Sequence, residues 1–416
     1  MSELYDVEKP IEKVILVGVA TDNNEDVVAL LKELEELAET AGAETIGTLI
    51  QNRERIHPGT YLGKGKLEEL KEMITELGAT GIICDDELSP AQLRNMEEAL
   101  DTKIMDRTLI ILDIFAQHAS TRDGKIQVEL AQLKYRSARL TGLGSSLSRL
   151  GGGIGTRGPG EKKLEMDRRL IKDRISHLSE ELAGIRNNRE VARKQRIQNR
   201  MPVASIVGYT NAGKSTLLNT LTDAGVLEEN KLFATLDPTT RCLTLPSKQE
   251  VLLTDTVGFI RKLPHHLIDA FRSTLEEAKY ADIIIHVVDS SNPHMDAHIA
   301  TVYDTLQQLG VEDKPIITLF NKQDLVEDAQ TLRDFKATKT LCVSAKHGDG
   351  LPNLLETIEE ILRSQKIYLE HLFPYTEGGK IAEIRKYGQL LKEEYQNDGI
   401  YVEAYIPHAV LGQLGL

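Results

Sequence analysis

The sequence predicts an α/β protein of four parts, and three observations carry that prediction. Strand and helix signals alternate over the first 115 residues, which is typical of a parallel sheet covered by helices. A glycine-rich loop at 208–215 lies between an apolar strand and a helix, the context of a phosphate-binding loop. Between these regions, basic residues on apolar heptads predict a long antiparallel helical hairpin. We therefore expect an N-terminal α/β domain (1–115), a basic hairpin with a glycine-rich loop (116–200), a P-loop α/β domain (201–365) and a small C-terminal α+β domain (366–416).

The N-terminal domain is expected to contain strands over 13–19, 44–50, 81–85 and 103–105. Helical periodicity covers 26–41 and 66–77, and Ser89-Pro90 opens a helix that ends at Leu100. One stretch between these elements is irregular, His57-Pro58-Gly59-Thr60-Tyr61-Leu62-Gly63-Lys64-Gly65-Lys66. It lacks the spacing of a phosphate loop, and we interpret it as a structural or docking loop.

The hairpin is predicted by apolar residues at seven-residue spacing on two helices. The positions are Ile126, Leu130, Leu133, Ser137 and Leu140, then Leu164, Ile171, Ile175, Leu178, Leu182 and Ile185. The connecting loop runs from Gly142 to Gly160 and carries Arg149 and Arg157. Its G-x-G-x-x-G match, Gly153 to Gly158, follows a helix and not a strand, which disfavours a dinucleotide site. A glycine-rich loop with arginines is suited to close approach to a phosphate backbone.

Charge is distributed very unevenly along the chain. The net charge is −14, yet residues 117–200 hold nineteen Lys and Arg against nine Asp and Glu, so they carry +10 and the remainder −24. Such asymmetry indicates a dedicated basic surface for nucleic acid. No run approaches the length of a membrane span, and no signal peptide is recognisable. Cys84, Cys242 and Cys342 lie in apolar strands, so we expect buried thiols in a reducing cytoplasm.

The phosphate loop is complete, with strand 204–207 before it and a helix from Thr216 after it. Its backbone N–H groups and the helix N-terminus would face phosphate oxygens. Lys214 would reach the β- and γ-phosphates, and the Ser215 hydroxyl would ligate Mg²⁺. The loop residues are Gly208, Tyr209, Thr210, Asn211, Ala212, Gly213, Lys214 and Ser215.

Three further motifs at strand ends specify a guanine nucleotide. After 251–253, Asp255 would hold Mg²⁺ through water and the Gly258 N–H would face the γ-phosphate. After 316–320, Asp324 can accept two hydrogen bonds from guanine, a donor pair that adenine lacks. Asn321 would meet N7, the Lys322 stem would lie over the base, and the segment after 340–343 would contact the guanine oxygen through its backbone. These motifs comprise Asp255, Thr256, Val257 and Gly258; Asn321, Lys322, Gln323 and Asp324; and Ser344, Ala345 and Lys346.

A threonine should sense the γ-phosphate through Mg²⁺ in the segment Leu232-Phe233-Ala234-Thr235-Leu236-Asp237-Pro238-Thr239-Thr240-Arg241. Thr235, Thr239 and Thr240 compete for this role. The segment resembles that of the Obg and HflX groups of GTPases, and this resemblance favours Thr235, with Phe233 to Asp237 around the nucleotide. The position directly after Gly258 is Phe259, which cannot orient water as the glutamine of Ras-like enzymes does. Slow hydrolysis is therefore expected. Two sources of help are open: a K⁺ ion held with Asn211, or a partner that orders the threonine-rich loop.

The last fifty residues predict a β-α-β-β-α unit. A strand over 367–373 and a helix over 379–387 precede a hairpin of 390–395 and 400–406 around Asn397-Asp398-Gly399. A helix over 407–414 would complete a truncated ferredoxin-like unit.

Taken together, these motifs are specific enough to identify a family resemblance. Residues 202–365 resemble the translation-factor class of P-loop GTPases, and the whole chain resembles the HflX group of ribosome-associated GTPases. The wider resemblance rests on Asn52-Arg53 with 57–66, on Asp106-Arg107-Thr108 before Ile114-Phe115-Ala116, on Gly158-Pro159-Gly160-Glu161, and on the 233–241 segment.

The resemblance implies a cytoplasmic GTPase that binds the large ribosomal subunit and its rRNA, with the hairpin loop directed towards the peptidyl-transferase region. It implies rescue or splitting of stalled ribosomes under stress. Two alternatives stay open: an assembly checkpoint on immature large subunits, and ATP-dependent RNA remodelling by the N-terminal domain.

Overall fold

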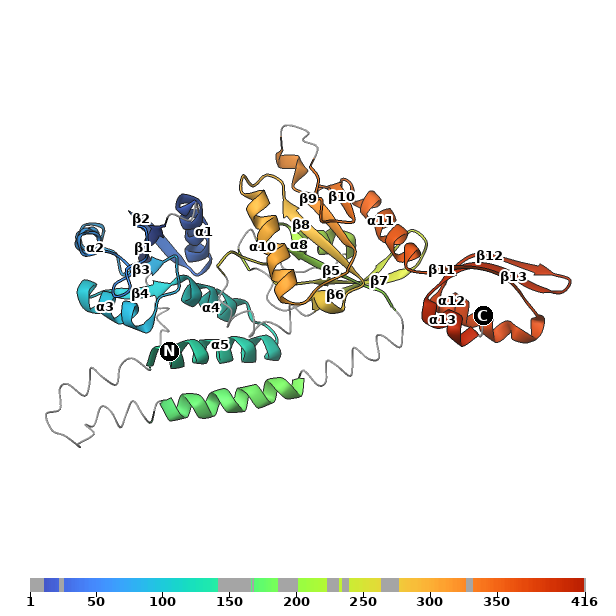
Figure 1. Cartoon of the computed structure of the whole chain (residues 1–416), viewed down its shortest axis with the longest axis horizontal. Helices are drawn as coiled ribbons and strands as arrows, with labels where there is room; N and C mark the ends of the chain where they lie inside the picture. Colours follow the sequence, from blue (N-terminus) through green and yellow to red (C-terminus); the bar gives the residue numbers. More distant parts are fainter. Residues whose placement is uncertain are drawn as a thin grey trace, which may run out of the picture. The chain divides into compact units, whose positions relative to one another are not determined.

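The computed structural model describes residues 11–21, 26–140, 166, 168–185, 201–222, 232–233, 239–262, 277–326 and 332–414 (Figure 1). The chain divides into two compact units. The first comprises 1–186, 230–236 and 262–271, and the second comprises 187–229, 237–261 and 272–416.

The first unit is built on a four-stranded parallel sheet of order β2-β1-β3-β4. Its central strands are apolar runs whose residues are buried on both faces, as a helix-covered parallel sheet requires. The strands are β1 (Glu12–Ala20), β2 (Ala43–Asn52), β3 (Gly81–Cys84) and β4 (Lys103–Asp106), with helices α1 (Val27–Thr40), α2 (Lys64–Leu77) and α3 (Pro90–Leu100) between them.

Helix starts in this unit follow local chemistry. The Asp26 carboxylate accepts from the Ala29 N–H at the start of α1, and Ser89 and Gln92 form a reciprocal capping box on α3. A fourth helix, α4 (Arg107–His118), was not predicted. Its apolar residues lie nearly all round the helix, so they give no one-sided periodicity.

The irregular loop at 57–66 is held by its own hydrogen bonds. His57 and Tyr61 exchange backbone hydrogen bonds, and His57 Nδ1 accepts from the backbone N–H groups of Gly59 and Thr60. Tyr61 has a φ of 61° and is buried, with its hydroxyl donating to Asp86. These contacts support a structural role for the loop.

Two helices lie along each other as the heptads predict (Figure 1). They are α5 (Arg122–Leu140) and a helix whose continuous described residues are 168–185. The seam is closed by ion pairs from Arg122 to Glu181 and from Arg174 to Glu129. It is packed from Ile126, Leu130, Leu133, Ile175, Leu178, Leu182 and Ile185. The predicted loop tip, including Arg149 and Arg157, lies outside the described residues.

A buried carboxylate fixes α5 to the sheet. Asp106, fully buried at the end of β4, accepts from the Tyr135 hydroxyl at 2.7 Å and from Arg139 Nη2 at 2.6 Å. It also accepts from the N–H groups of Leu88 and Leu109, and so caps α4. One carboxylate therefore joins β4, α4 and α5.

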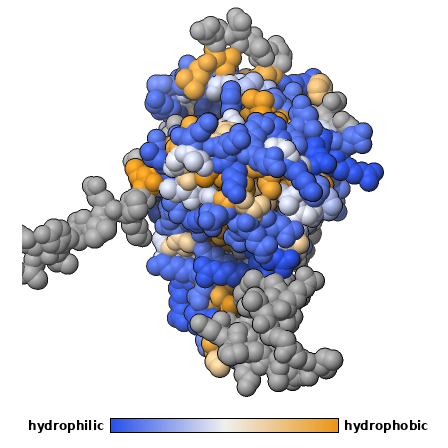
Figure 2. All heavy atoms as spheres, turned by 90° about the vertical axis from the view of Figure 1, so that its left-hand side faces the viewer, coloured by the Kyte–Doolittle hydropathy of each residue, from blue (hydrophilic) through white to orange (hydrophobic). Residues whose placement is uncertain are grey.

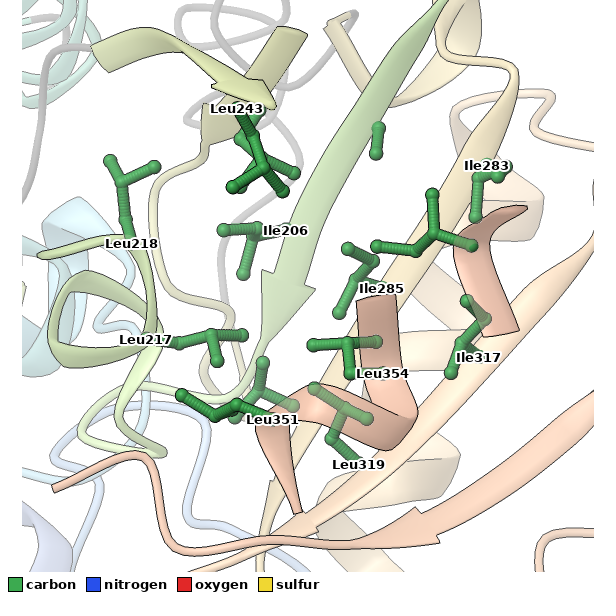
Figure 3. Packing of buried hydrophobic residues seen from close by; sticks show 14 of the residues in the cluster. Ile206, Leu217, Leu218, Leu243, Ile283, Ile285, Ile317, Leu319, Leu351 and Leu354 are labelled. Carbon is green, nitrogen blue, oxygen red and sulfur yellow. The ribbon is translucent and has the colours of Figure 1, made fainter. Parts of the chain in front are cut away.

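The second unit contains a six-stranded sheet of order β10-β9-β8-β5-β7-β6, parallel except for β6. Leucine and isoleucine side chains from the strands and from α8 and α11 pack together beside it (Figure 3). The strands are β5 (Val203–Gly208), β6 (Thr239–Thr244), β7 (Glu250–Asp255), β8 (Ile283–Asp289), β9 (Ile316–Asn321) and β10 (Lys339–Cys342), and the helices α8 (Lys214–Thr222), α10 (Met295–Gln308) and α11 (Leu351–Ser364).

The small C-terminal part has the predicted strand and helix order. Strands β11 (Ile367–Phe373), β12 (Gln389–Gln396) and β13 (Gly399–Ile406) form an antiparallel sheet of order β11-β13-β12. Helices α12 (Gly378–Tyr387) and α13 (His408–Leu414) share its core of Phe373, Ile384, Val402 and Val410.

The expectation of three buried thiols is wrong. Cys84 is buried in β3, but Cys242 and Cys342 are exposed. Cys242 lies on β6 and Cys342 on β10. These are the two edge strands of the six-stranded sheet, where side chains that point outward are exposed to solvent. Within the described part of the chain, no helix is both long and apolar enough to cross a membrane. The face in Figure 2 is mostly hydrophilic, with hydrophobic residues in small groups.

Replacing Asp106 by alanine should strongly destabilise the first unit. It would leave the guanidinium of Arg139, which is 13% exposed, without its carboxylate, and such a loss costs about 3–5 kcal/mol. Urea unfolding followed by circular dichroism would measure the change. Asp173→Ala, at an exposed position on the 168–185 helix, is the control and should leave the transition in place. Equal transitions for the two variants would contradict the role given to Asp106.

Candidate functional site

The predicted phosphate loop connects β5 directly to α8. Gly208 lies against the β8 backbone, and Asn211 and Gly213 take positive φ values of 58° and 97°. A Cβ at Gly213 would lie 2.3 Å from Asn321 Nδ2, so only glycine fits there. The chain thus curls tightly at the helix N-terminus, where backbone N–H groups and the helix dipole favour anions.

Lys214 is buried beneath this loop. Its ammonium donates to the Tyr209 carbonyl at 2.7 Å, and burial lowers its pKa to about 8 although the nearby Asp255 opposes the shift. A cation held with so little water binds a phosphate oxygen more strongly than an exposed lysine would.

Two oxygen groups suited to Mg²⁺ meet next to the loop. The Ser215 hydroxyl donates to Asp255 Oδ2 at 2.8 Å, bringing the helix start to the end of β7. Hydroxyl and carboxylate oxygens are the ligands that this hard cation prefers, with phosphates and water completing its shell. Thr256 donates to the Ile206 carbonyl and ties the same strand end to β5.

The segment after Asp255 runs over the phosphate loop. A Cβ at Gly258 would lie 2.9 Å from Thr210 Cα and 3.0 Å from Lys214 Nζ, so glycine is required for this approach. Phe259 is buried, and its backbone N–H donates to the Gly208 carbonyl while its carbonyl accepts from the Thr210 N–H. Its ring therefore fills the core and is not available to water.

The side chain of Asn321 joins the phosphate loop to the motif at 344–346. Nδ2 donates to the Ala212 carbonyl at 2.9 Å, and Oδ1 accepts from the Ala345 N–H at 2.9 Å. The side chain is buried, and both of its polar atoms are engaged. A contact from Asn321 to guanine N7 stays a prediction.

The Asp324 carboxylate is presented as an ionised acceptor. A hydrogen bond from the Ser344 hydroxyl at 2.6 Å is the main cause that lowers its pKa. Lys322 pairs with Asp289 at 2.7 Å, and the Gln323 amide donates to Ser290. Asp289, the last residue of β8, and Ser290, the next residue, were not predicted because no motif marks them.

The threonine-rich segment is described only in part. Leu232 and Phe233 are buried, and the Phe233 ring meets Phe115 edge-to-face within the first unit. Thr239 and Thr240 belong to β6, where the Thr240 and Thr254 hydroxyls share a hydrogen bond. Ala234, Thr235, Leu236 and Asp237, which complete the predicted segment, lie outside the described residues.

Comparison with known families covers most of the chain. Residues 29–116 match the GTP-binding GTPase N-terminal family, 118–196 the GTP-binding GTPase Middle Region, and 203–322 the 50S ribosome-binding GTPase family.

Full-length relatives agree with these matches. The GTPase HflX of Lacrimispora saccharolytica is 66% identical over 414 residues, covering 100% of this chain and 98% of the relative. The GTPase HflX of Caldanaerobacter subterraneus subsp. tengcongensis is 50% identical over 95% of this chain and 91% of the relative. That of Escherichia coli K12 is 39% identical over 93% and 92%. With this identity over nearly the whole length, and with the phosphate loop and guanine motifs gathered at one sheet edge, the chain belongs to the HflX family of GTPases.

Proposed function

We propose that this GTPase acts on the large ribosomal subunit and separates the subunits of stalled ribosomes. The observation that carries the proposal is the charge of the basic hairpin. Residues 117–200 have a net charge of +10, whereas the rest of the chain has a net charge of −24. Lys125, Lys134 and Arg136 on α5 and Arg169 and Lys172 on the partner helix are exposed. Exposed cations of this kind neutralise RNA phosphates.

The way in which the hairpin is attached to the N-terminal sheet supports the same proposal. Asp106 ties α5 to β4 and α4 through Tyr135 and Arg139, and the apolar seam ties the second helix to α5. A charged hairpin whose base is rigidly attached can exert a force on bound RNA, whereas a flexible segment would only bind the RNA. The match of 203–322 to a family described as 50S ribosome-binding GTPases agrees with such a target.

Nucleotide chemistry follows from the site. Lys214 and the loop N–H groups would bind the phosphates, Ser215 and Thr235 would ligate Mg²⁺, and Asp255 would hold the ion through water. Bound Mg²⁺ would neutralise charge on the phosphates. The Gly258 N–H would face the γ-phosphate. Asp324, with Ser344 to Lys346, would select guanine.

Splitting is tested by sedimenting mature ribosomes with the protein and a non-hydrolysable GTP analogue. Wild type should shift ribosomes to free subunits. Deletion of Gly151 to Gly158 should abolish this shift while GDP affinity stays within about twofold, since the loop lies outside every nucleotide motif. Lys134→Glu with Arg136→Glu should weaken binding and flatten its salt dependence. Lys71→Glu on exposed α2 is the control.

Three results would count against this proposal. Wild-type splitting by the deletion variant would reject the loop as the acting element. Binding to immature large subunits with mature ribosomes left intact would favour an assembly checkpoint. ATP-dependent RNA unwinding that survives Lys214→Ala would favour remodelling by the N-terminal domain.

Guanine selection is tested by Asp324→Asn. The asparagine can still accept from Ser344, but its amide cannot accept from both guanine donors. GTP affinity should fall about 100-fold, because hydrogen bonds to a charged group are lost, and affinity for xanthosine triphosphate should rise. Fluorescent-nucleotide titration measures both constants. Asp313→Asn, exposed at a φ of 55° that asparagine tolerates, is the control.

We propose further that K⁺ bound with Asn211 assists hydrolysis. Phe259 is buried and cannot orient water, and Asn211, at a φ of 58°, carries an amide oxygen able to ligate a monovalent cation. GTPase rates should be higher in KCl than in NaCl, and Asn211→Ser should remove the difference. Asn353→Ser, at an exposed position on α11, should retain it. A fast rate in sodium without ribosomes would contradict the need for outside help.

A further inference from the structure

Tyr209, the second residue of the phosphate loop, is buried and engaged on two sides. Its ring stacks on His298 of α10, with centroids 3.7 Å apart and planes 4° from parallel. Its hydroxyl accepts from the Arg261 backbone N–H at 2.9 Å. Burial lowers the pKa of His298 to about 4, so the stacking partner is neutral at physiological pH.

The backbone of the same residue reaches the catalytic lysine and the strand end. Its carbonyl accepts from Lys214 Nζ, and a parallel bridge pairs Tyr209 with Phe259. The segment from Gly258 to Arg261 is consequently fixed at two points: by the backbone of Phe259, and by the N–H of Arg261. Both anchors come from the first three residues of the phosphate loop.

We propose that Tyr209 is a positioning residue for hydrolysis, holding Gly258 to Arg261 so that the Gly258 N–H is fixed where the γ-phosphate must lie. This inference rests on the γ-phosphate role proposed for Gly258. The stack on His298 fixes the orientation of the Tyr209 ring. The hydroxyl of the fixed ring then determines where the Arg261 N–H lies.

Such positioning is needed because Phe259, the residue directly after Gly258, has no side chain able to orient water. With Phe259 in the core, the described residues 258–260 can offer the γ-phosphate their backbone N–H groups but no polar side chain. A backbone donor stabilises a transition state only when it is aimed beforehand, since it cannot rotate into place as a side chain can. The hydrogen bond from the Arg261 N–H to the Tyr209 hydroxyl, three residues after Gly258, helps to fix the orientation of the Gly258 N–H.

A purely structural tyrosine would behave differently from a positioning one. GDP has no γ-phosphate, so losing the Arg261 anchor should leave GDP binding unchanged. Damage to the phosphate loop as a whole would weaken GDP and GTP alike. Comparison of kcat with the affinities for both nucleotides separates the two roles.

The test is Tyr209→Phe, which keeps the ring and its stack and removes only the hydroxyl. Single-turnover GTP hydrolysis should slow about three- to tenfold, the range expected for one neutral hydrogen bond. Affinity for fluorescent GDP should stay within about twofold of wild type. Tyr303→Phe is the matched control. It removes a tyrosine hydroxyl on α10 that donates to Asp334 at 2.7 Å, away from the loop, and should hydrolyse GTP at the wild-type rate.

Wild-type hydrolysis by Tyr209→Phe would overturn the inference, as would an equal loss of GDP and GTP affinity or an equal slowing in Tyr303→Phe. Lys214→Ala keeps these results distinct from failure of the site itself. If Lys214→Ala is inactive while Tyr209→Phe is unchanged, the site stands and the role of Tyr209 falls. If Lys214→Ala retains full activity, the assignment of the loop fails.

Discussion

The side chain of Asn321 is the contact on which the nucleotide site depends. It joins the Ala212 carbonyl to the Ala345 N–H, and therefore holds the loop proposed to bind phosphate against the segment proposed to bind the base. Gly213 has to be glycine because the amide occupies the space of its Cβ. Since both polar atoms of a buried amide are satisfied here, neither half can shift without leaving one of them unpaired, which is costly away from water.

The grouping of the motif residues could be predicted from sequence because the motifs are local. Gly213, Lys214 and Ser215 are needed within one turn of chain, and Asp324 follows a recognisable strand. What could not be predicted are partners brought from elsewhere in the chain. Asp289 meets Lys322, and His298 stacks on Tyr209, only because β8 and α10 lie beside the loop-bearing strands.

In the fold, too, local patterns could be predicted from sequence and contacts between distant parts of the chain could not. Strand and helix order in the first unit followed from alternating patterns, but α4 did not, since burial on nearly every side removes the periodic signal. Cys242 and Cys342 were misjudged because a strand's own residues do not reveal whether it becomes an edge. Asp106 looked like one member of a short motif. Its importance comes from Tyr135 and Arg139, a helix further on.

Burial of Phe259 changes what limits this enzyme. In a Ras-like site the glutamine at this position orients the attacking water. Here the corresponding residue is held to the phosphate loop by two backbone hydrogen bonds, and the Tyr209 hydroxyl holds Arg261 two residues further on, so the three contacts together order the segment. Further ordering of that segment can add little. We therefore expect the hydrolysis rate to depend on a group supplied from outside this segment, whether a cation or a macromolecular partner. On this proposal, the protein stays in the GTP-bound state until that group is supplied.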